Sequence, residues 1–281
     1  MHDEKIALIL KELDKVTESN YHYFSKNTVM IPSRIEVIKI LKRLLSIMFP
    51  EYFPCFDDEG KGRGEIAEEI LSSLKRQITA SYSFFGKDSC VDTESIALEI
   101  LSLIPTIKDK LIKDVTAVYE GDPAASSPEE VILAYPGFYA VSIYRLAHEF
   151  YIRKIPYISR IMTEYAHEKT GIDIHAGATI GEYFFIDHGT GIVIGETTTI
   201  GDRVKIYQGV TLGAKSFELD DDGNPIKGIK RHPDIGNNCV IYANATILGG
   251  NTKIGDGCTI GGNVWLTHSV PAGETVYYNG K

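Results

Sequence analysis

Two neighbouring residues that could carry out acid–base chemistry, Asp187 and His188, lie in the stretch IDHGTGIVIGE at residues 186–196. A neutral imidazole titrates near physiological pH, so His188 could remove a proton from a hydroxyl group. Asp173 lies fifteen residues earlier, close to one circuit of the repeat described below. A carboxylate beside a histidine fixes its tautomer and stabilises the imidazolium. We therefore expect His188 to act as a general base that is oriented by Asp173.

A second group of chemically capable residues is the basic cluster KGIKRH at residues 227–232, which includes Arg231 and His232. The chain as a whole has a net charge of −9 and no basic tail, which argues against non-specific binding of nucleic acid. A local basic cluster on an acidic protein is better suited to a small anionic ligand. A solvated loop explains the cluster equally well from composition alone.

The elements that position these residues fall into two halves. Residues 1–170 show apolar residues at helical spacing, and Gly171 ends the last helical segment. The stretch Ser127-Pro128-Glu129-Glu130 reads as a helix start, with a cap, a proline in the first turn and two acids. Further helices are expected over residues 6–16, 35–48, 66–78, 93–103, 137–153 and 156–169.

After Gly171 an aliphatic residue recurs every six positions, often followed by glycine. The two ladders are Ile174, Ile180, Ile186, Ile194, Ile200, Ile206, Leu212 and Ile235, Ile241, Ile247, Ile254, Ile260, Leu266. A fixed short period is typical of a solenoid, and a six-residue period predicts short strands on the faces of a parallel β-helix. The expected fold class is therefore α+β: an all-α domain over residues 1–170 and a β-helix domain over residues 171–281.

The six-residue ladder is interrupted in three places. Two residues are inserted at Asp187–Gly191, a long loop at about 214–232 separates Leu212 from Ile235, and one residue is added in ILGGNTKIG. The core of a repeat protein demands its period, so departures are expected where function overrides local rules. The first two interruptions contain Asp187, His188, Arg231 and His232, so we place the site there.

The motifs around these interruptions resemble one family. DIH at 173–175, IDHGTGIVIGET at 186–197, VTLGAK at 210–215 and KRHPDIG at 230–236 are similar to serine O-acetyltransferases of cysteine biosynthesis. YEGDPAA at 119–125 and YPGFYAVSIYRLAH at 135–148 extend the likeness upstream. The resemblance implies a left-handed β-helix and transfer of acetyl from acetyl-CoA to the hydroxyl of L-serine. Serine itself is then the nucleophile, and no enzyme nucleophile is needed.

The resemblance also assigns the substrate contacts. Asp122 and Asp187 are expected near the ammonium of serine, Arg231 with His232 near its carboxylate, and Glu196 in support. Arginine suits a carboxylate because its fork binds two oxygens. Acetyl-CoA is expected along the β-helix between subunits, and its contacts are expected at Gly213, Ala214, Lys215, Asn244 and Lys230. The structural alternatives are that Asp187 caps the bulge, that Asp122 with Pro123 ends a helix, and that Arg231 with His232 forms a loop hinge.

The remaining expectations concern compartment and partners. No apolar run spans a bilayer, the N-terminus does not read as a signal peptide, and four scattered cysteines read as reduced thiols, so a cytoplasmic protein is expected. A thin prism favours a homotrimer or a dimer of trimers. The resemblance adds L-cysteine as a feedback inhibitor. The chain ends in VYYNGK without the terminal Ile that docks many members on O-acetylserine sulfhydrylase, which argues against that complex.

Three other functions compete with this interpretation. Some β-helices carry a zinc-type carbonic anhydrase, but that site needs three converging imidazoles with two close in sequence, and we expect no metal. An O-acetyltransferase for homoserine or a sugar shares the histidine, but not the paired Asp187 and Arg231 or the helical domain. A non-catalytic trimeric scaffold is disfavoured by the intact Asp173, His188 and Arg231.

Overall fold

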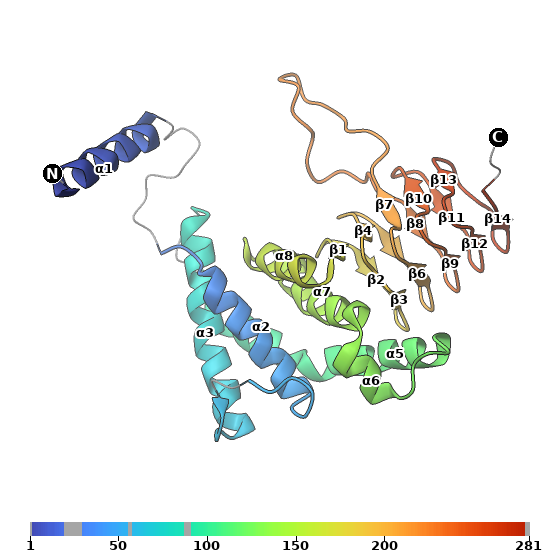
Figure 1. Ribbon diagram of the computed structural model, residues 1–281, viewed down its shortest axis with the longest axis horizontal. Coiled ribbons are helices and arrows are strands. Elements are labelled where there is room, and N and C mark those ends of the chain that lie inside the picture. The colour runs from blue at the N-terminus through green and yellow to red at the C-terminus, as the bar shows by residue number, and fades with distance from the viewer. Residues whose placement is uncertain (1, 20–29, 56–57, 87–90, 279–281) are drawn as a thin grey trace.

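The computed structural model describes residues 2–19, 30–55, 58–86 and 91–278. Its helices are α1 (His2–Ser19), α2 (Arg34–Met48), α3 (Arg63–Phe84), α4 (Thr93–Ser102), α5 (Ile104–Gly121), α6 (Pro128–Ala134), α7 (Pro136–Ile152) and α8 (Ile158–Thr170). The fold class predicted from the sequence, helices followed by a parallel β-helix, is confirmed (Figure 1).

All of the predicted helices are present, and the ends of several follow the capping residues. Ser33 accepts a hydrogen bond from the Glu36 amide at the start of α2, and Ser127 accepts one from the Glu130 amide at the start of α6. Gly171 ends α8 with φ of 69°. One helix was not predicted: α5 begins at Ile104, because Pro105 sits in its first turn instead of only ending α4.

The β-helix has three faces of parallel strands. Its strands are β1 (Asp173–Ile174), β2 (Thr179–Ile180), β3 (Phe185–Asp187), β4 (Val193–Ile194), β5 (Thr199–Ile200), β6 (Lys205–Tyr207), β7 (Thr211–Gly213), β8 (Asp234–Ile235), β9 (Val240–Ile241), β10 (Thr246–Leu248), β11 (Lys253–Ile254), β12 (Thr259–Ile260), β13 (Trp265–Leu266) and β14 (Thr275–Val276). Sheet A holds β1, β4, β7, β10 and β13; sheet B holds β2, β5, β8 and β11; sheet C holds β3, β6, β9, β12 and β14.

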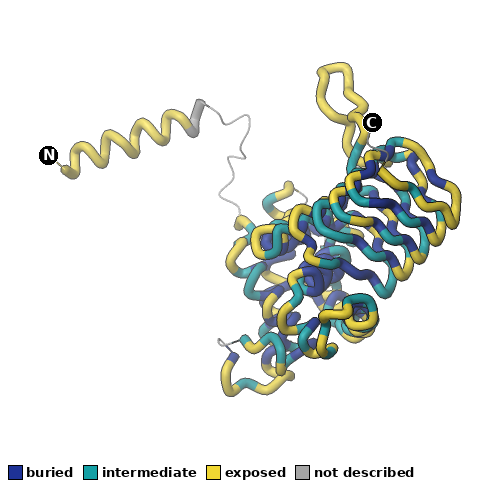
Figure 2. Tube along the Cα trace, turned by 45° about the vertical axis from the view of Figure 1, so that its right-hand side comes forward, coloured by how far each residue is buried: buried dark blue, intermediate teal, exposed yellow. Residues whose placement is uncertain are grey.

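The ladder of aliphatic residues forms the core of this prism. Ile174 of β1 pairs in register with Ile194 of β4, and Ile194 pairs with Leu212 of β7. Every residue of the two predicted ladders is buried. The six-residue period is therefore confirmed as the spacing of inward side chains, and the dark stripes in Figure 2 follow it around each turn.

The helices and the first turn of the β-helix share one hydrophobic core. Helices α5 and α7 pack against β3, and α8 packs against β1. A buried ion pair joins them: Arg145 of α7 binds both carboxylate oxygens of Asp114 of α5 and donates to the carbonyl oxygen of Gly181. The change from helix to strand falls at Gly171, and the division into two domains at residue 170 stays a prediction.

Candidate active site

The predicted general base lies in the turn from sheet C to sheet A, which we call the C–A edge. After β3 the chain enters a bulge in which His188 has φ of 56° and Gly189 φ of 88°. A Cβ on Gly189 would lie 2.4 Å from Cδ1 of Ile172, so the bulge packs tightly against the start of the β-helix. The two inserted residues thus explain why the ladder breaks: they push His188 outward, where its side chain is 71% exposed.

The carboxylate nearest the His188 ring is its neighbour in sequence. Nε2 of His188 lies 3.7 Å from Oδ1 of Asp187. Within the described residues, His188 forms no hydrogen bond or ion pair with Asp173. The register explains this, because Asp173 is paired with Val193 one circuit later and His188 precedes that position in the bulge. Orientation of His188 by Asp173 therefore stays a prediction.

Two further residues face the same edge. Asp122 follows the end of α5, and its Oδ1 accepts a hydrogen bond from the Ala124 amide at 2.8 Å. Its Oδ2 accepts one from the hydroxyl of Tyr135 at 2.7 Å. The hydrogen bond to Asp122 is the main cause that raises the pKa of Tyr135 to about 12, and the charge of Asp187 adds to it. Tyr135 thus contacts Asp122 and lies within the electrostatic reach of Asp187, so the structure places the two carboxylates in the same neighbourhood.

The C–A edge carries two carboxylates, Asp122 and Asp187. Neither Asp122 nor Asp187 forms an ion pair with a lysine or arginine of the described residues. Burial and the charges of Asp187 and Asp122 raise the pKa of Tyr207, which pairs with Asp187 across β3 and β6. Two carboxylates beside an exposed imidazole form a site suited to an ammonium group next to a proton acceptor.

The predicted carboxylate-binding residues lie elsewhere, in the turns from sheet A to sheet B, which we call the A–B edge. There Arg231 donates to Oε2 of Glu196, and the hydroxyl of Tyr151 donates to Oε1 of Glu196 at 2.7 Å. Burial opposes ionisation of Glu196, but these two hydrogen bonds, together with the charges of His175 and Arg231, outweigh it and lower the pKa of Glu196. Glu196 thus anchors Arg231. Its supporting role in the serine site stays a prediction.

His232 is a buried and uncharged part of the same edge. The Thr197 amide donates to its Nδ1 at 3.1 Å, so Nδ1 carries no proton. Burial, together with the guanidinium of Arg231, lowers the pKa of His232 to about 4. The hydroxyl oxygen of Thr197 accepts hydrogen bonds from the amides of Arg231 and His232, which fixes the end of the long loop.

The residues predicted to contact acetyl-CoA are divided between the two edges. The A–B edge carries four of them, at the end of β7 and in the loop that follows it: Gly213, Ala214, Lys215 and Lys230. Asn244 lies on the C–A edge, four residues before Leu248, which pairs with Gly213. A hollow of about 300 Å³ on the A–B edge is lined by Lys215, Lys230 and Arg231. Lys230 also forms an ion pair with Asp234, whereas Lys215 is exposed.

The two halves of the predicted serine site therefore lie on opposite edges of sheet A. Asp187 and His188 precede β4, and Glu196 follows it. Arg231 joins Glu196 on the far side. A single chain does not bring the base and the arginine together.

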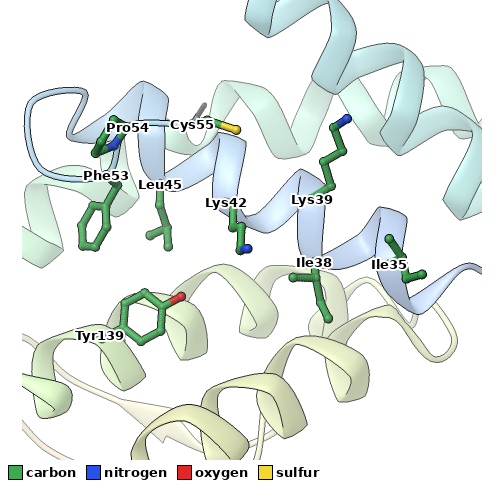
Figure 3. A pocket seen from close by; sticks show the side chains of 9 residues that line it. All are labelled: Ile35, Ile38, Lys39, Lys42, Leu45, Phe53, Pro54, Cys55 and Tyr139. Atoms are coloured by element: carbon green, nitrogen blue, oxygen red, sulfur yellow. The ribbon is translucent and has the colours of Figure 1, made fainter. Parts of the chain in front are cut away.

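Other features of the described residues add no alternative site. A cavity of about 550 Å³ between α2 and α7 has mostly apolar walls with Lys39 and Lys42, and it contains none of the predicted site residues (Figure 3). Within the described ranges no group of three or more His, Cys, Asp or Glu side chains is placed to hold a metal ion. None of the described helices is both long and apolar enough to cross a membrane.

Known proteins resemble this chain closely in sequence and fold. It is 45% identical over 274 residues to a plasmid serine acetyltransferase of Synechococcus elongatus, which covers 91% of this chain and 84% of that protein. The crystal structure of Entamoeba histolytica serine acetyltransferase 1 in complex with L-cysteine matches it with a TM-score of 0.74 and 39% identity, over 85% of this chain and 86% of that one. Serine acetyltransferase of Brucella abortus in complex with coenzyme A matches with a TM-score of 0.60 and 25% identity, over 96% and 90% of the two chains.

No family model matches the chain. The identity to the Synechococcus elongatus protein nevertheless extends over nearly the whole length of both chains, and the helices and the β-helix are both shared with the solved structures. By its sequence and its fold, the chain belongs to the serine acetyltransferase family.

Proposed function

We propose that the protein transfers the acetyl group of acetyl-CoA to the hydroxyl of L-serine, giving O-acetylserine and free CoA. The observation that carries this proposal is the pair of carboxylates, Asp122 and Asp187, beside the exposed imidazole of His188. Such a site binds the ammonium of an amino acid and places its hydroxyl near a base. The relatives named serine acetyltransferase support the same acceptor.

The residues would act as follows. His188 takes the proton of the serine hydroxyl as its oxygen attacks the thioester carbonyl carbon. The C–S bond then breaks, and the CoA thiolate receives that proton from the imidazolium. Asp173 is proposed to orient and stabilise the imidazolium in the assembled enzyme. Arg231, held by Glu196, binds the carboxylate of serine with His232 beside it.

The active unit is a trimer in this proposal, with each site shared by two copies. The C–A edge carries the base and the ammonium site, and the A–B edge carries Arg231 and the hollow with Lys215 and Lys230. A closed ring of three prisms places the C–A edge of one copy against the A–B edge of the next. Both halves of the serine site, and the two groups of predicted CoA contacts, then face one cleft.

We expect L-cysteine to bind at the same site as L-serine. Cysteine differs from serine by a thiol in place of the hydroxyl, so it would occupy the same ammonium and carboxylate positions and compete with serine. The structure of the Entamoeba histolytica enzyme was solved in complex with L-cysteine.

The cysteines of the chain bear on its location. Cys239 and Cys258 are buried free thiols, which suits the reducing cytoplasm that we propose as the location.

The direct test is thiol release from acetyl-CoA with L-serine, L-homoserine and a sugar in parallel. We expect activity with serine alone, and a loss of at least about 100-fold in His188→Ala, the scale of general-base contributions. Equal activity on homoserine or a sugar would assign another acceptor. Unchanged activity of His188→Ala would remove the proposed base.

Sharing of the site is tested by co-expressing two inactive variants, His188→Ala and Arg231→Ala. An interface between an intact C–A edge and an intact A–B edge occurs in about one quarter of random pairings in a trimer. Co-expression should therefore recover up to that share of wild-type activity. No recovery, in trimers that contain both variants, would place each site within one chain.

A further inference from the structure

Tyr135 is a residue that motif reasoning does not assign, and it lies where the helices meet the site. Tyr135 lies between α6 and α7, where it is both the C-cap of α6 and the N-cap of α7. Its hydroxyl donates to Oδ2 of Asp122, while the Ala124 amide donates to Oδ1. Each carboxylate oxygen therefore has one fixed donor, which sets the plane of the carboxylate and leaves its other lone pairs for a ligand.

The position of Tyr135 is tied to the strand that carries Asp187. Gly137, two residues later, packs directly on Ile186: a Cβ there would lie 2.7 Å from the Ile186 carbonyl oxygen. Only a glycine allows the start of α7 to lie this close to β3. The contact couples the phenol of Tyr135 to the backbone next to Asp187, so the two carboxylates are held in one frame.

Electrostatics explains why a phenol is useful at this point. The charges of Asp122 and Asp187 both raise the pKa of Tyr135 and of Tyr207, so the two carboxylates share one neighbourhood. The nearby amino group of Lys205 lies against Gly121 and over the Phe185 ring, and it forms no ion pair with Asp122. A neutral donor to Asp122 stabilises its charge without occupying the place of a cation.

We propose that Tyr135 is a positioning residue for the acceptor: its phenol holds the carboxylate of Asp122 in the orientation that binds the ammonium of serine. This inference rests on the proposed function. Tyr135 touches neither the hydroxyl that reacts nor the thioester, so its removal should weaken serine binding and leave the chemical step nearly intact.

The variant Tyr135→Phe keeps the ring and removes only the hydroxyl. We expect the KM for L-serine to rise about tenfold, the scale of a lost hydrogen bond to a charged group. The kcat and the KM for acetyl-CoA should stay within about twofold. The matched control is Tyr119→Phe, an exposed tyrosine on α5, which should leave all three values unchanged. A uniform loss of kcat, or an unchanged KM for serine, would overturn the inference.

A double-variant cycle separates positioning from general structural damage. If Tyr135 acts through Asp122, then Tyr135→Phe should add little to the loss in kcat/KM already caused by Asp122→Asn. The inhibition constant of 3-hydroxypropionate, which lacks the amino group, should not change in Tyr135→Phe. Additive losses in the cycle, or an equal weakening of 3-hydroxypropionate, would assign Tyr135 a merely structural role. A wild-type chain that releases no thiol with serine would instead overturn the proposed function and this inference together.

Discussion

The ring of His232 lies directly on Gly195: a Cβ on Gly195 would fall 2.0 Å from Cδ2 of the imidazole. No real side chain tolerates that distance, so this position on the A–B edge requires glycine. Nδ1 of the His232 ring accepts a hydrogen bond from the Thr197 amide. This contact holds His232 in place and so immobilises Arg231, the preceding residue in the chain. Gly195, which follows Ile194 in the repeat, therefore makes room for the His232 ring at the site and also allows the chain to turn between two faces of the β-helix.

The first prediction follows from this contact. Gly195→Ala should push the imidazole away from Thr197 and release Arg231, at a cost of about 1–3 kcal/mol of stability, as for overpacked cores. Thermal unfolding and the KM for serine measure the two effects, and both should worsen. Gly64→Ala on α3 is the control, because a Cβ there meets nothing within 4 Å. Normal stability and a normal KM in Gly195→Ala would show that the ring is not fixed by this glycine.

The second prediction concerns pH and His232. The pKa of His232 in the folded protein, about 4, lies below the ordinary value of 6.5 for histidine, so the unfolded chain binds the extra proton first as the pH falls. The stability from this residue is therefore complete above about pH 6.5 and is lost as the pH falls towards about 4. Arg231, Lys230 and His175 oppose its protonation, and Glu196 favours it. We expect the loss to be about 1–2 kcal/mol after solvent screening.

Denaturation of wild type and His232→Asn between pH 7 and pH 4 isolates this contribution. Acidic groups titrate in the same range in both proteins, so only the difference between the two curves reports on the imidazole. The wild type should lose stability more steeply than the variant. Parallel curves would mean that His232 is charged or solvated in the folded protein.

The third prediction addresses the joint between the helices and the β-helix. Asp114 and Arg145 are both almost fully buried, and Asp114 also accepts the Phe184 amide at 2.9 Å. Asp114→Ala leaves a buried guanidinium without its partner, which should cost about 3–5 kcal/mol. Asp109→Asn on the same helix removes an exposed partner of Lys113 and should cost under about 1 kcal/mol. Equal costs in urea denaturation would show that the pair is not desolvated.

The sequence predicted the core of the β-helix well, because a narrow prism admits one large inward side chain per strand and leaves a visible period. It predicted the circuit length at the site badly. Asp173 pairs with Val193, twenty positions on, because the inserted residues around His188 lengthen that turn. A bulge is visible as a break in the period, but the direction in which it projects a side chain depends on backbone angles such as the positive φ of His188.

Two other failures have similar physical causes. The apolar residues Ile107, Leu111 and Val115 of α5 are buried at helical spacing. The sequence nevertheless predicts no helix there, because Pro105 can either end the helix over 93–103 or start a new one. The division of the site residues between two edges was not predicted either. A resemblance transfers residues of an assembled enzyme, and it does not say which edge of which copy carries each one.

The last prediction concerns the long loop on the A–B edge. Its tip is a hairpin in which the Ile226 amide donates to the carbonyl oxygen of Glu218, and Leu219 bridges to Pro225. Oδ1 of Asp220 caps the turn by accepting hydrogen bonds from the backbone amides of Asp222 and Asn224. The hairpin is exposed and adds little to the core, so its removal should hardly change the stability of the fold.

The hairpin does, however, form one wall beside the proposed substrate residues. Phe217 and Ile226, like Arg231, line two hollows of about 300 and 280 Å³. Replacing Leu219–Pro225 by Gly-Gly keeps the Glu218 and Ile226 ends together as a two-residue hairpin and shortens the wall. We expect the KM values of the substrates to change severalfold and the melting temperature to move by less than about 2 °C. The variant Asp221→Asn keeps the hairpin and removes one charge. It therefore separates the effect of the hairpin's length from the effect of its charge. Unchanged kinetics with a collapsed melting temperature would show that the loop supports the fold and not the site.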